Sequence, residues 1–236
     1  MSTANTAHLI IADSETNADL YYATHFSAPD AFIFLKTSTE TVLLISDLEL
    51  DRARSQSRVD TILPLSHYIE KAKKTGIETP NMGHALNLFL QEKGIRHLQV
   101  PRTFPISLAD ELRSQGYALA FPDGAFWPER EIKTPDEIEY IRQVQRHTEK
   151  AMDAAIHIIQ NASIHNGMLY HQNHPLTAEA VKRCIHITLI ENECNARHTI
   201  VACGDQACDP HNEGSGILYA NQPIIIDIFP RSDHTG

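Results

Sequence analysis

The chain has 236 residues, of which 42% are hydrophobic and 21% are charged, with 20 basic against 30 acidic side chains. This length suits one large hydrophobic core or two cores of about 100 to 130 residues each, and we interpret the chain as two domains. The formal charge of −10 at pH 7 argues against a nucleic-acid partner, because nucleic acids select basic surfaces.

The sequence shows no sign of a membrane segment or a disulfide framework. The first residues, MSTANTAH, lack the basic and apolar regions of a signal peptide, and no apolar run approaches the roughly 18 to 20 residues that span a bilayer. The four cysteines form no CxxC pair, so free thiols are expected. These features predict a cytoplasmic protein with no membrane partner.

The first half of the chain predicts an α/β domain with a mixed sheet, because β-rich runs alternate with helical patterns. The predicted strands are His8–Ala12, Ala31–Thr37, Glu40–Asp47, Val59–Leu65, Arg96–Val100 and Tyr117–Phe121, of which the second and third form a hairpin. The predicted helices are Ser66–Lys74, Asn81–Lys93 and Ser107–Gln115, with serine hydroxyls capping the first and third. This half contains no glycine-rich phosphate loop and no Gly-x-Ser-x-Gly motif, so nothing in it indicates catalysis.

A proline- and glycine-containing segment, FPDGAFWPEREIK, separates the two halves and contains the single tryptophan. We place the domain boundary in this segment, between residues 1–128 and residues 129–236.

The second half opens with a strong helix start. Thr134 is the predicted N-cap, Pro135 occupies the first helical position, and Glu137 completes a capping box. The helix is predicted to run to about Asn161. Its apolar residues recur at three- and four-residue spacing and predict one extensively packed face: Ile138, Ile141, Val144, Thr148, Ala151, Ala155 and Ile158.

A second helix is predicted from Thr177 to about Asn192, and a loop connects the two helices. Five histidines lie in or between these helices at spacings that fit no HExxH motif. We interpret all five as structural: His157, His165, His171, His174 and His186.

The chain ends on a predicted strand, Pro223–Phe229, that carries one acid. Alternation places Ile224, Ile226 and Ile228 on one face and Ile225, Asp227 and Phe229 on the other. A carboxylate buried in a sheet is costly unless it is hydrogen-bonded, paired with a cation or bound to a metal. Asp227 is therefore the first candidate for a functional residue.

The segment around a further predicted strand, Thr199–Ala202, and the polar stretch after it concentrate the other candidates, and three interpretations stay open. The first is a zinc site, although its spacing matches no common module: His198, Cys203, Cys208 and His211. The second is a substrate-side histidine, His211, facing a metal ligand, Asp227. In the third, His211 is a polar loop residue bonded to the backbone.

The order of these motifs resembles one known family. The pattern E-x-x-x-K-x-P-x-E-I, two helices, and then IVACGDQACDPH and IIIDIFPRSDHTG are similar to the pita-bread metallopeptidases, relatives of aminopeptidase P, prolidase and creatinase. In the first half, NADLYYATHF and SDLELDRAR are similar to their creatinase-type amino-terminal domain. The resemblance covers nearly the whole chain.

The resemblance implies an α/β fold in which a creatinase-type amino-terminal domain precedes the first part of a pita-bread catalytic α+β domain. It implies that Asp227 is the first of five ligands of a dinuclear site for manganese, or for cobalt, magnesium or zinc. It also implies that His211 hydrogen-bonds substrate near the scissile bond. The implied protein is a homodimeric Xaa-Pro aminopeptidase, which hydrolyses the N-terminal Xaa-Pro bond of proline-containing peptides.

The family pattern continues beyond the position of Gly236 with an aspartate in a D-x-T-R context, a histidine and two glutamates. With one ligand of five, this chain alone is expected to bind no metal pair tightly and to be inactive. The alternative is a non-catalytic protein that uses its amino-terminal domain for self-association or regulation.

Overall fold

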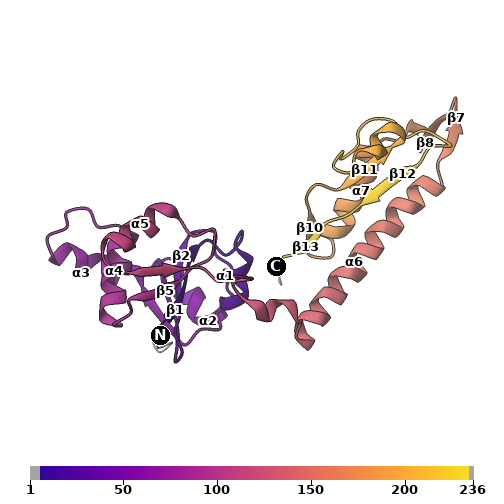
Figure 1. Cartoon of the computed structure of the whole chain (residues 1–236). Coiled ribbons are helices and arrows are strands. Elements are labelled where there is room, and N and C mark those ends of the chain that lie inside the picture. Colours follow the sequence, from indigo (N-terminus) through magenta and orange to yellow (C-terminus); the bar gives the residue numbers. More distant parts are fainter. Residues whose placement is uncertain (1–5, 234–236) are drawn as a thin grey trace. The chain divides into compact units, whose positions relative to one another are not determined.

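The computed structural model describes residues 6–233, which divide into two compact units, one up to Ile132 and one from Lys133 (Figure 1). The elements of the first unit are β1 (Thr6–Ala12), α1 (Ala18–Thr24), β2 (Phe32–Lys36), β3 (Thr41–Ile45), α2 (Leu50–Gln56), β4 (Thr61–Pro64), α3 (Leu65–Lys74), α4 (Met82–Glu92), β5 (His97–Gln99), α5 (Ile106–Ser114), β6 (Ala118–Ala120) and the 3-10 helix η1 (Pro128–Glu131). The elements of the second unit are α6 (Pro135–Gln160), β7 (Ser163–His165), β8 (Met168–His171), β9 (His174–Pro175), α7 (Ala178–Ile190), β10 (Cys194–Ala196), β11 (Ile200–Cys203), the 3-10 helix η2 (Gly204–Cys208), β12 (Ile224–Asp227) and β13 (Pro230–Ser232).

The first unit is built on one six-stranded sheet in the order β4-β3-β2-β1-β5-β6. The pairs β1–β2 and β2–β3 are antiparallel, and the pairs β3–β4, β1–β5 and β5–β6 are parallel. The mixed sheet, its six strands and its hairpin, as predicted from the sequence, are therefore confirmed.

Both faces of this sheet are buried, which the alternation along β1 shows. Leu9 and Ile11 belong to a cluster with residues of α3, α4 and α5, whereas Ile10 belongs to a cluster with residues of α1 and α2. Successive side chains of a strand point to opposite faces, so the helices form one layer on each side of the sheet.

Two predicted serine caps are wrong. The N-cap residues of α3 and α5 are Pro64 and Pro105, and neither helix has a side-chain cap. The ψ angles of these prolines, 131° and 121°, lie outside the helical range as at other N-caps, and each helix begins with the following residue, one earlier than predicted. Ser66 lies inside α3, and its hydroxyl donates to Asp47 Oδ1 at 3.0 Å.

The segment before the division between the units is partly an element of the first core. Phe126 and Trp127 are 7% and 4% exposed and pack against the face of the sheet that α1 and α2 cover. The Trp127 ring stacks on His8 with centroids 5.2 Å apart, and Lys36 Nζ lies 4.7 Å from the tryptophan ring. These aromatic contacts hold the end of the first unit onto its own sheet.

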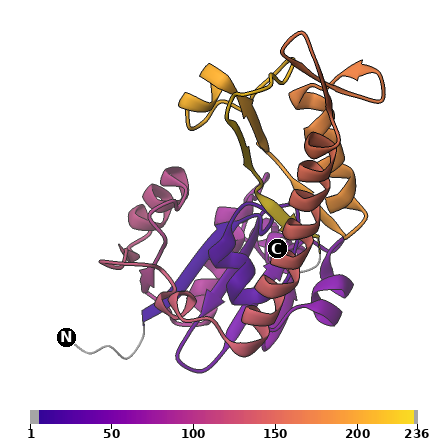
Figure 2. The same ribbon diagram turned by 90° about the vertical axis from the view of Figure 1, so that its right-hand side faces the viewer.

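The second unit contains two long helices, α6 and α7, which lie side by side in both views (Figure 2). The predicted capping box of α6 is confirmed, because Thr134 Oγ1 accepts from the backbone N–H of Glu137 and the Glu137 carboxylate accepts from that of Thr134. Ala151 and Ala155 are fully buried in the contact with α7. The first turns of α6 differ from the prediction, since Ile138 and Ile141 are 40% and 55% exposed.

Three small sheets complete the second unit: β7-β8-β9, β11-β12 and β10-β13. The sequence analysis missed β7, β8, β9, β10 and β13, whose two to four residues are too short for an alternating pattern. His171 and His174, predicted in a loop, pair across a hairpin of β8 and β9 whose two turn residues have positive φ angles. In residues 6–233 no helix is both long enough and apolar enough to cross a lipid bilayer.

Candidate functional site

The strand β11 links the two residues that the sequence analysis selected. Along one edge it pairs with β12, in the register that places Ile200 opposite Asp227. On its other side, Val201 N–H donates to Glu213 O at 3.0 Å. One buried strand therefore holds Asp227 and, through Glu213, the loop that contains His211.

The two faces of β12 alternate as predicted, but the position of the acid differs. Ile224 and Ile226 are half-buried and Ile228 is 9% exposed, whereas the face with Asp227 includes Ile225, which is 47% exposed. The prediction of a buried carboxylate is wrong, because Asp227 is exposed among the described residues. The energetic cost of burial therefore gives no argument for a metal at Asp227.

The strand β12 also has an open edge within the part of the chain that the structure describes. Its sheet has two strands, and β11 pairs with one edge of β12. The bond from Gly204 N–H to Pro223 O, at 3.0 Å, sets the alternation along the pair, so the peptide groups of Ile224 and Ile226 face the other edge. The strand thus presents both an acid and unpaired backbone groups at the surface.

The His211 loop is bonded internally. His211 N–H donates to Asp209 Oδ1 at 3.1 Å, and Gly214 N–H donates to Asn212 Oδ1 at 2.9 Å. These bonds hold the backbone, while the His211 side chain is exposed and its ring makes no hydrogen bond within residues 6–233. A ring in this state is available to a ligand.

The same loop is fixed to β11 by a close backbone contact and to α7 by a lysine side chain. Gly214 has a φ of +74°, and a Cβ at that position would lie 1.8 Å from Val201 O, so no other residue fits without a shift of the backbone. Lys182 Nζ donates to Gly214 O at 2.9 Å and to Glu213 O at 3.2 Å. Loop and strand therefore form one rigid surface.

The structure adds a pair that the sequence analysis missed. His198 Nδ1 lies 2.8 Å from Glu213 Oε1, and both side chains are largely exposed. Fifteen residues separate the two, so spacing along the sequence gave no signal for the contact.

The zinc interpretation is wrong for the described residues. No group of three or more His, Cys, Asp or Glu side chains between residues 6 and 233 could hold one metal ion. Cys203 Sγ instead accepts from Tyr219 N–H at 3.3 Å. Asp227 offers one hard oxygen donor without a hydrogen bond or ion pair in the described chain, but its neighbours there do not complete a metal site.

Two of the five histidines interpreted as structural have contacts that fit this role. His186 Nε2 lies 3.0 Å from Thr199 Oγ1, and the His165 ring meets the edge of Tyr170 with centroids 5.2 Å apart. The final residues of the IIIDIFPRSDHTG motif, from His234 on, lie outside the described residues.

Comparison with known proteins shows which families and folds this chain is similar to. Residues 139–236 match the family model "Metallopeptidase family M24". A search of curated protein sequences gave no match.

Solved structures match almost the whole chain. They include the prolidase from Pyrococcus furiosus (TM-score 0.69, 18% identity, 97% of this chain and 58% of that one). An X-Pro aminopeptidase from Thermotoga maritima matches with a TM-score of 0.70 and 17% identity, over 95% of this chain and 58% of that one. A Xaa-Pro dipeptidase from Bacillus anthracis matches with a TM-score of 0.73 and 14% identity, over 94% of this chain and 55% of that one.

Because the sequence identities are low, these matches establish similarity of fold and nothing about activity. They confirm the predicted fold class, an amino-terminal α/β domain followed by part of a pita-bread domain. The chain spans a little over half the length of the matched proteins, 55% to 58%.

Proposed function

We propose that the protein hydrolyses the bond before proline at the N-terminus of peptides, a proposal that starts from the match of residues 139–236 to the model of metallopeptidase family M24. The observation that carries the proposal is the arrangement around β11, which ties an exposed carboxylate, Asp227, and the loop of an exposed histidine, His211, to one buried strand. The similar folds of a prolidase and an X-Pro aminopeptidase support the same substrate class.

We assign Asp227 the role of a metal ligand. An exposed carboxylate on a paired strand is a hard oxygen donor with a fixed backbone position, which suits manganese and also cobalt, magnesium or zinc. A pair of divalent ions would supply a Lewis acid for the peptide carbonyl and a bound water of lowered pKa. Asp227 would hold one of these ions next to the exposed face of β12.

We assign His211 the role of a substrate contact. Its backbone is held by Asp209, and its loop is fixed to β11, so the exposed ring can donate or accept a hydrogen bond from a well-placed stretch of backbone. A peptide bound near the scissile bond would be oriented by this bond and not by the metal alone.

We propose further that this chain alone binds no metal pair tightly and is inactive by itself. The described residues supply Asp227 but no group of three ligands, and two divalent ions need more donors than one carboxylate. Homodimerisation and a cytoplasmic location remain predictions from the sequence.

The first test is to read the coding sequence beyond codon 236 and to express the protein it encodes. We expect a D-x-T-R motif, a later histidine and two glutamates, and release of the first residue from Xaa-Pro peptides that depends on added manganese. A stop codon in place of these motifs would rule out the enzymatic proposal, and self-association of the chain would then favour the non-catalytic alternative.

The second test replaces the proposed ligand in that longer protein. Asp227→Ala should abolish peptidase activity and lower the bound metal measured by elemental analysis. Asp205→Ala, at another exposed acid of the same unit, should change neither quantity. Unchanged activity of Asp227→Ala would refute the ligand role.

The third test separates substrate contact from metal binding. His211→Ala should lower kcat more than it lowers the bound metal, because the ring contacts peptide and not metal. Equal loss of both would place His211 among the metal ligands.

A further inference from the structure

The pair of His198 and Glu213 fixes the proton of one imidazole. Glu213 can only accept as a carboxylate, so His198 Nδ1, at 2.8 Å, donates to Oε1. In the neutral ring the other nitrogen, Nε2, is then an acceptor. The His198 side chain is 80% exposed, and within residues 6–233 its Nε2 has no hydrogen-bond partner.

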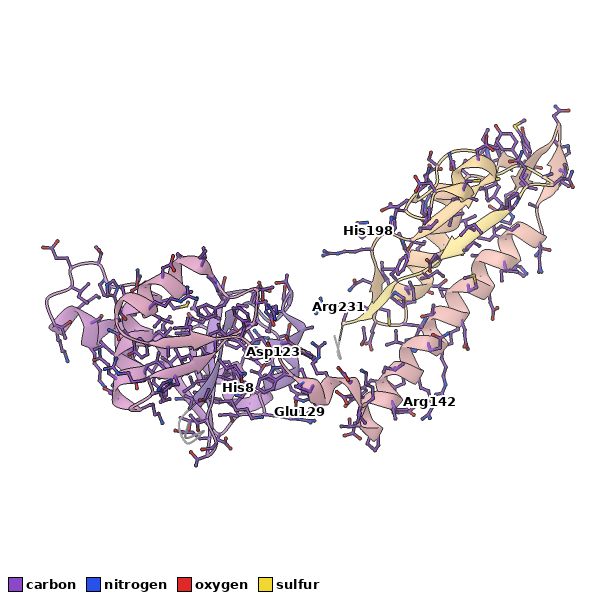
Figure 3. All side chains as sticks on the ribbon, in the orientation of Figure 1. His8, Asp123, Glu129, Arg142, His198 and Arg231 are labelled. Carbon is purple, nitrogen blue, oxygen red and sulfur yellow. The ribbon has the colours of Figure 1, made fainter. Side chains whose placement is uncertain are left out.

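The pair lies at the end of β11 that is nearest to Asp227. His198 precedes Ile200 by two residues, and Ile200 is the residue opposite Asp227. Glu213 is tied to the neighbouring residue, Val201, through its carbonyl. In Figure 3, His198 projects from the side of the second unit that is turned away from α6.

The loop does not depend on this pair for its position. The close backbone contact at Gly214 and the hydrogen bonds from Lys182 Nζ to the loop carbonyls already fix it, and exposed ion pairs contribute little to stability. The main consequence of the Glu213 carboxylate is therefore the orientation and the tautomer of His198.

We propose that His198 is a second substrate contact, whose Nε2 accepts a hydrogen bond from an N–H of the bound peptide, and that Glu213 positions it. This inference rests on the function proposed above. Proline has no N–H, so a peptide with proline in second place offers two nearby donors: the terminal amino group and the N–H of the third residue.

The two donors can be separated with three probes. Ala-Pro-Ala offers both donors, the dipeptide Ala-Pro offers the amino group alone, and propionyl-Pro-Ala, whose first acyl group lacks the amino nitrogen, offers only the N–H of the residue after proline. The test uses the protein encoded by the complete coding sequence, with ¹⁵N-labelled histidine, and follows the Nε2 resonance that disappears in His198→Gln.

We expect this resonance to shift with Ala-Pro-Ala and with only one of the other two probes. The probe that shifts it identifies which N–H donates to His198. For the hydrolysed peptides, His198→Ala should raise KM roughly 3- to 10-fold, the effect of one hydrogen bond, and change kcat less than about 2-fold. Glu213→Gln, which can still accept from Nδ1, should raise KM less than Glu213→Ala. Glu139→Gln, at the exposed partner of Arg142, which Figure 3 labels on α6, should change nothing.

Two outcomes overturn the inference. One is a His198 resonance that no probe shifts, and the other is a KM of His198→Ala equal to that of the unchanged protein. A protein that hydrolyses none of these peptides argues against the proposed function, whereas the resonance still decides whether His198 binds them.

Discussion

The two units enclose their sheets to different degrees. In the first unit, helices cover both faces of six strands, and Phe32, Phe34 and Leu44 are at most 1% exposed. In the second unit, β12 is covered on one face, and its other face leaves Ile225 and Phe229 47% and 52% exposed beside Asp227. The side chains proposed for function therefore lie on the less enclosed unit, where local opening costs the least free energy.

The largest expected effect comes from opening the enclosed core. Phe89 of α4 is fully buried and meets the edge of Tyr68 with centroids 5.5 Å apart. Phe89→Ala should lower the free energy of unfolding of the first unit by about 3–5 kcal/mol, because it removes a large buried side chain and leaves a cavity. The midpoint of urea unfolding, followed by fluorescence of the single tryptophan, Trp127, reports on this unit.

A matched control and a second signal decide whether the units are separate. Phe121→Ala, at a phenylalanine that is 52% exposed, should move the midpoint little. Protection of the Val201 amide from hydrogen exchange reports on the second unit and should persist in Phe89→Ala. If both signals are lost together, the units unfold as one and the comparison fails.

The sequence was sufficient for the elements that have a local cause. The capping box at Thr134 and the six strands of the first unit follow from side-chain chemistry and from alternation within a few residues. The separation of Ile224, Ile226 and Ile228 from Asp227 follows from the same period of two.

The sequence was insufficient where the cause is not local. Whether Asp227 is buried depends on which elements cover its face of the sheet. Alternation along the strand specifies the face on which Asp227 lies, but not whether another element packs against that face. The pair of His198 and Glu213 depends on a loop that returns to β11 at Gly214, and the burial of Trp127 depends on its stack with His8 from the other end of the unit. Such contacts are set by tertiary packing.

An intermediate effect is expected where the second unit is most tightly packed. Gly214→Ala should destabilise this unit by about 2–4 kcal/mol, since it adds a Cβ to a left-handed residue against the backbone of Val201. Faster hydrogen exchange of the Val201 amide, which donates to Glu213 O, would measure the loss.

The control for this prediction is a second left-handed glycine. Gly216 has a φ of +77°, but a Cβ there would meet no atom within 4 Å. Gly216→Ala should therefore cost about 1–2 kcal/mol, the backbone term alone. Equal effects of the two substitutions would show that the close contact with β11 contributes nothing.

The smallest effect concerns pH and belongs to the first unit. Burial, and then the charge of Lys36, lower the pKa of His8 below its usual 6.5, although Glu129 and a hydrogen bond with Gln99 act in the opposite direction. The unfolded chain then binds a proton more readily than the folded one. The stability of the first unit should be complete above about pH 6.5 and should fall as the pH drops below that value toward the pKa of the folded state.

The stack of Trp127 on His8 makes this loss measurable at its source. Urea midpoints from tryptophan fluorescence at pH 7.5 and pH 5.5 should differ in the unchanged protein and differ less in Lys36→Met, which removes the neighbouring cation. His8→Phe keeps an aromatic ring against Trp127 and removes the titration, so its midpoint should lose this pH dependence, whereas His97→Asn, at an exposed histidine of the same sheet, should keep it. A pH dependence that survives in His8→Phe would assign the acid sensitivity to another group, and the stack of His8 on Trp127 would then have no role in it.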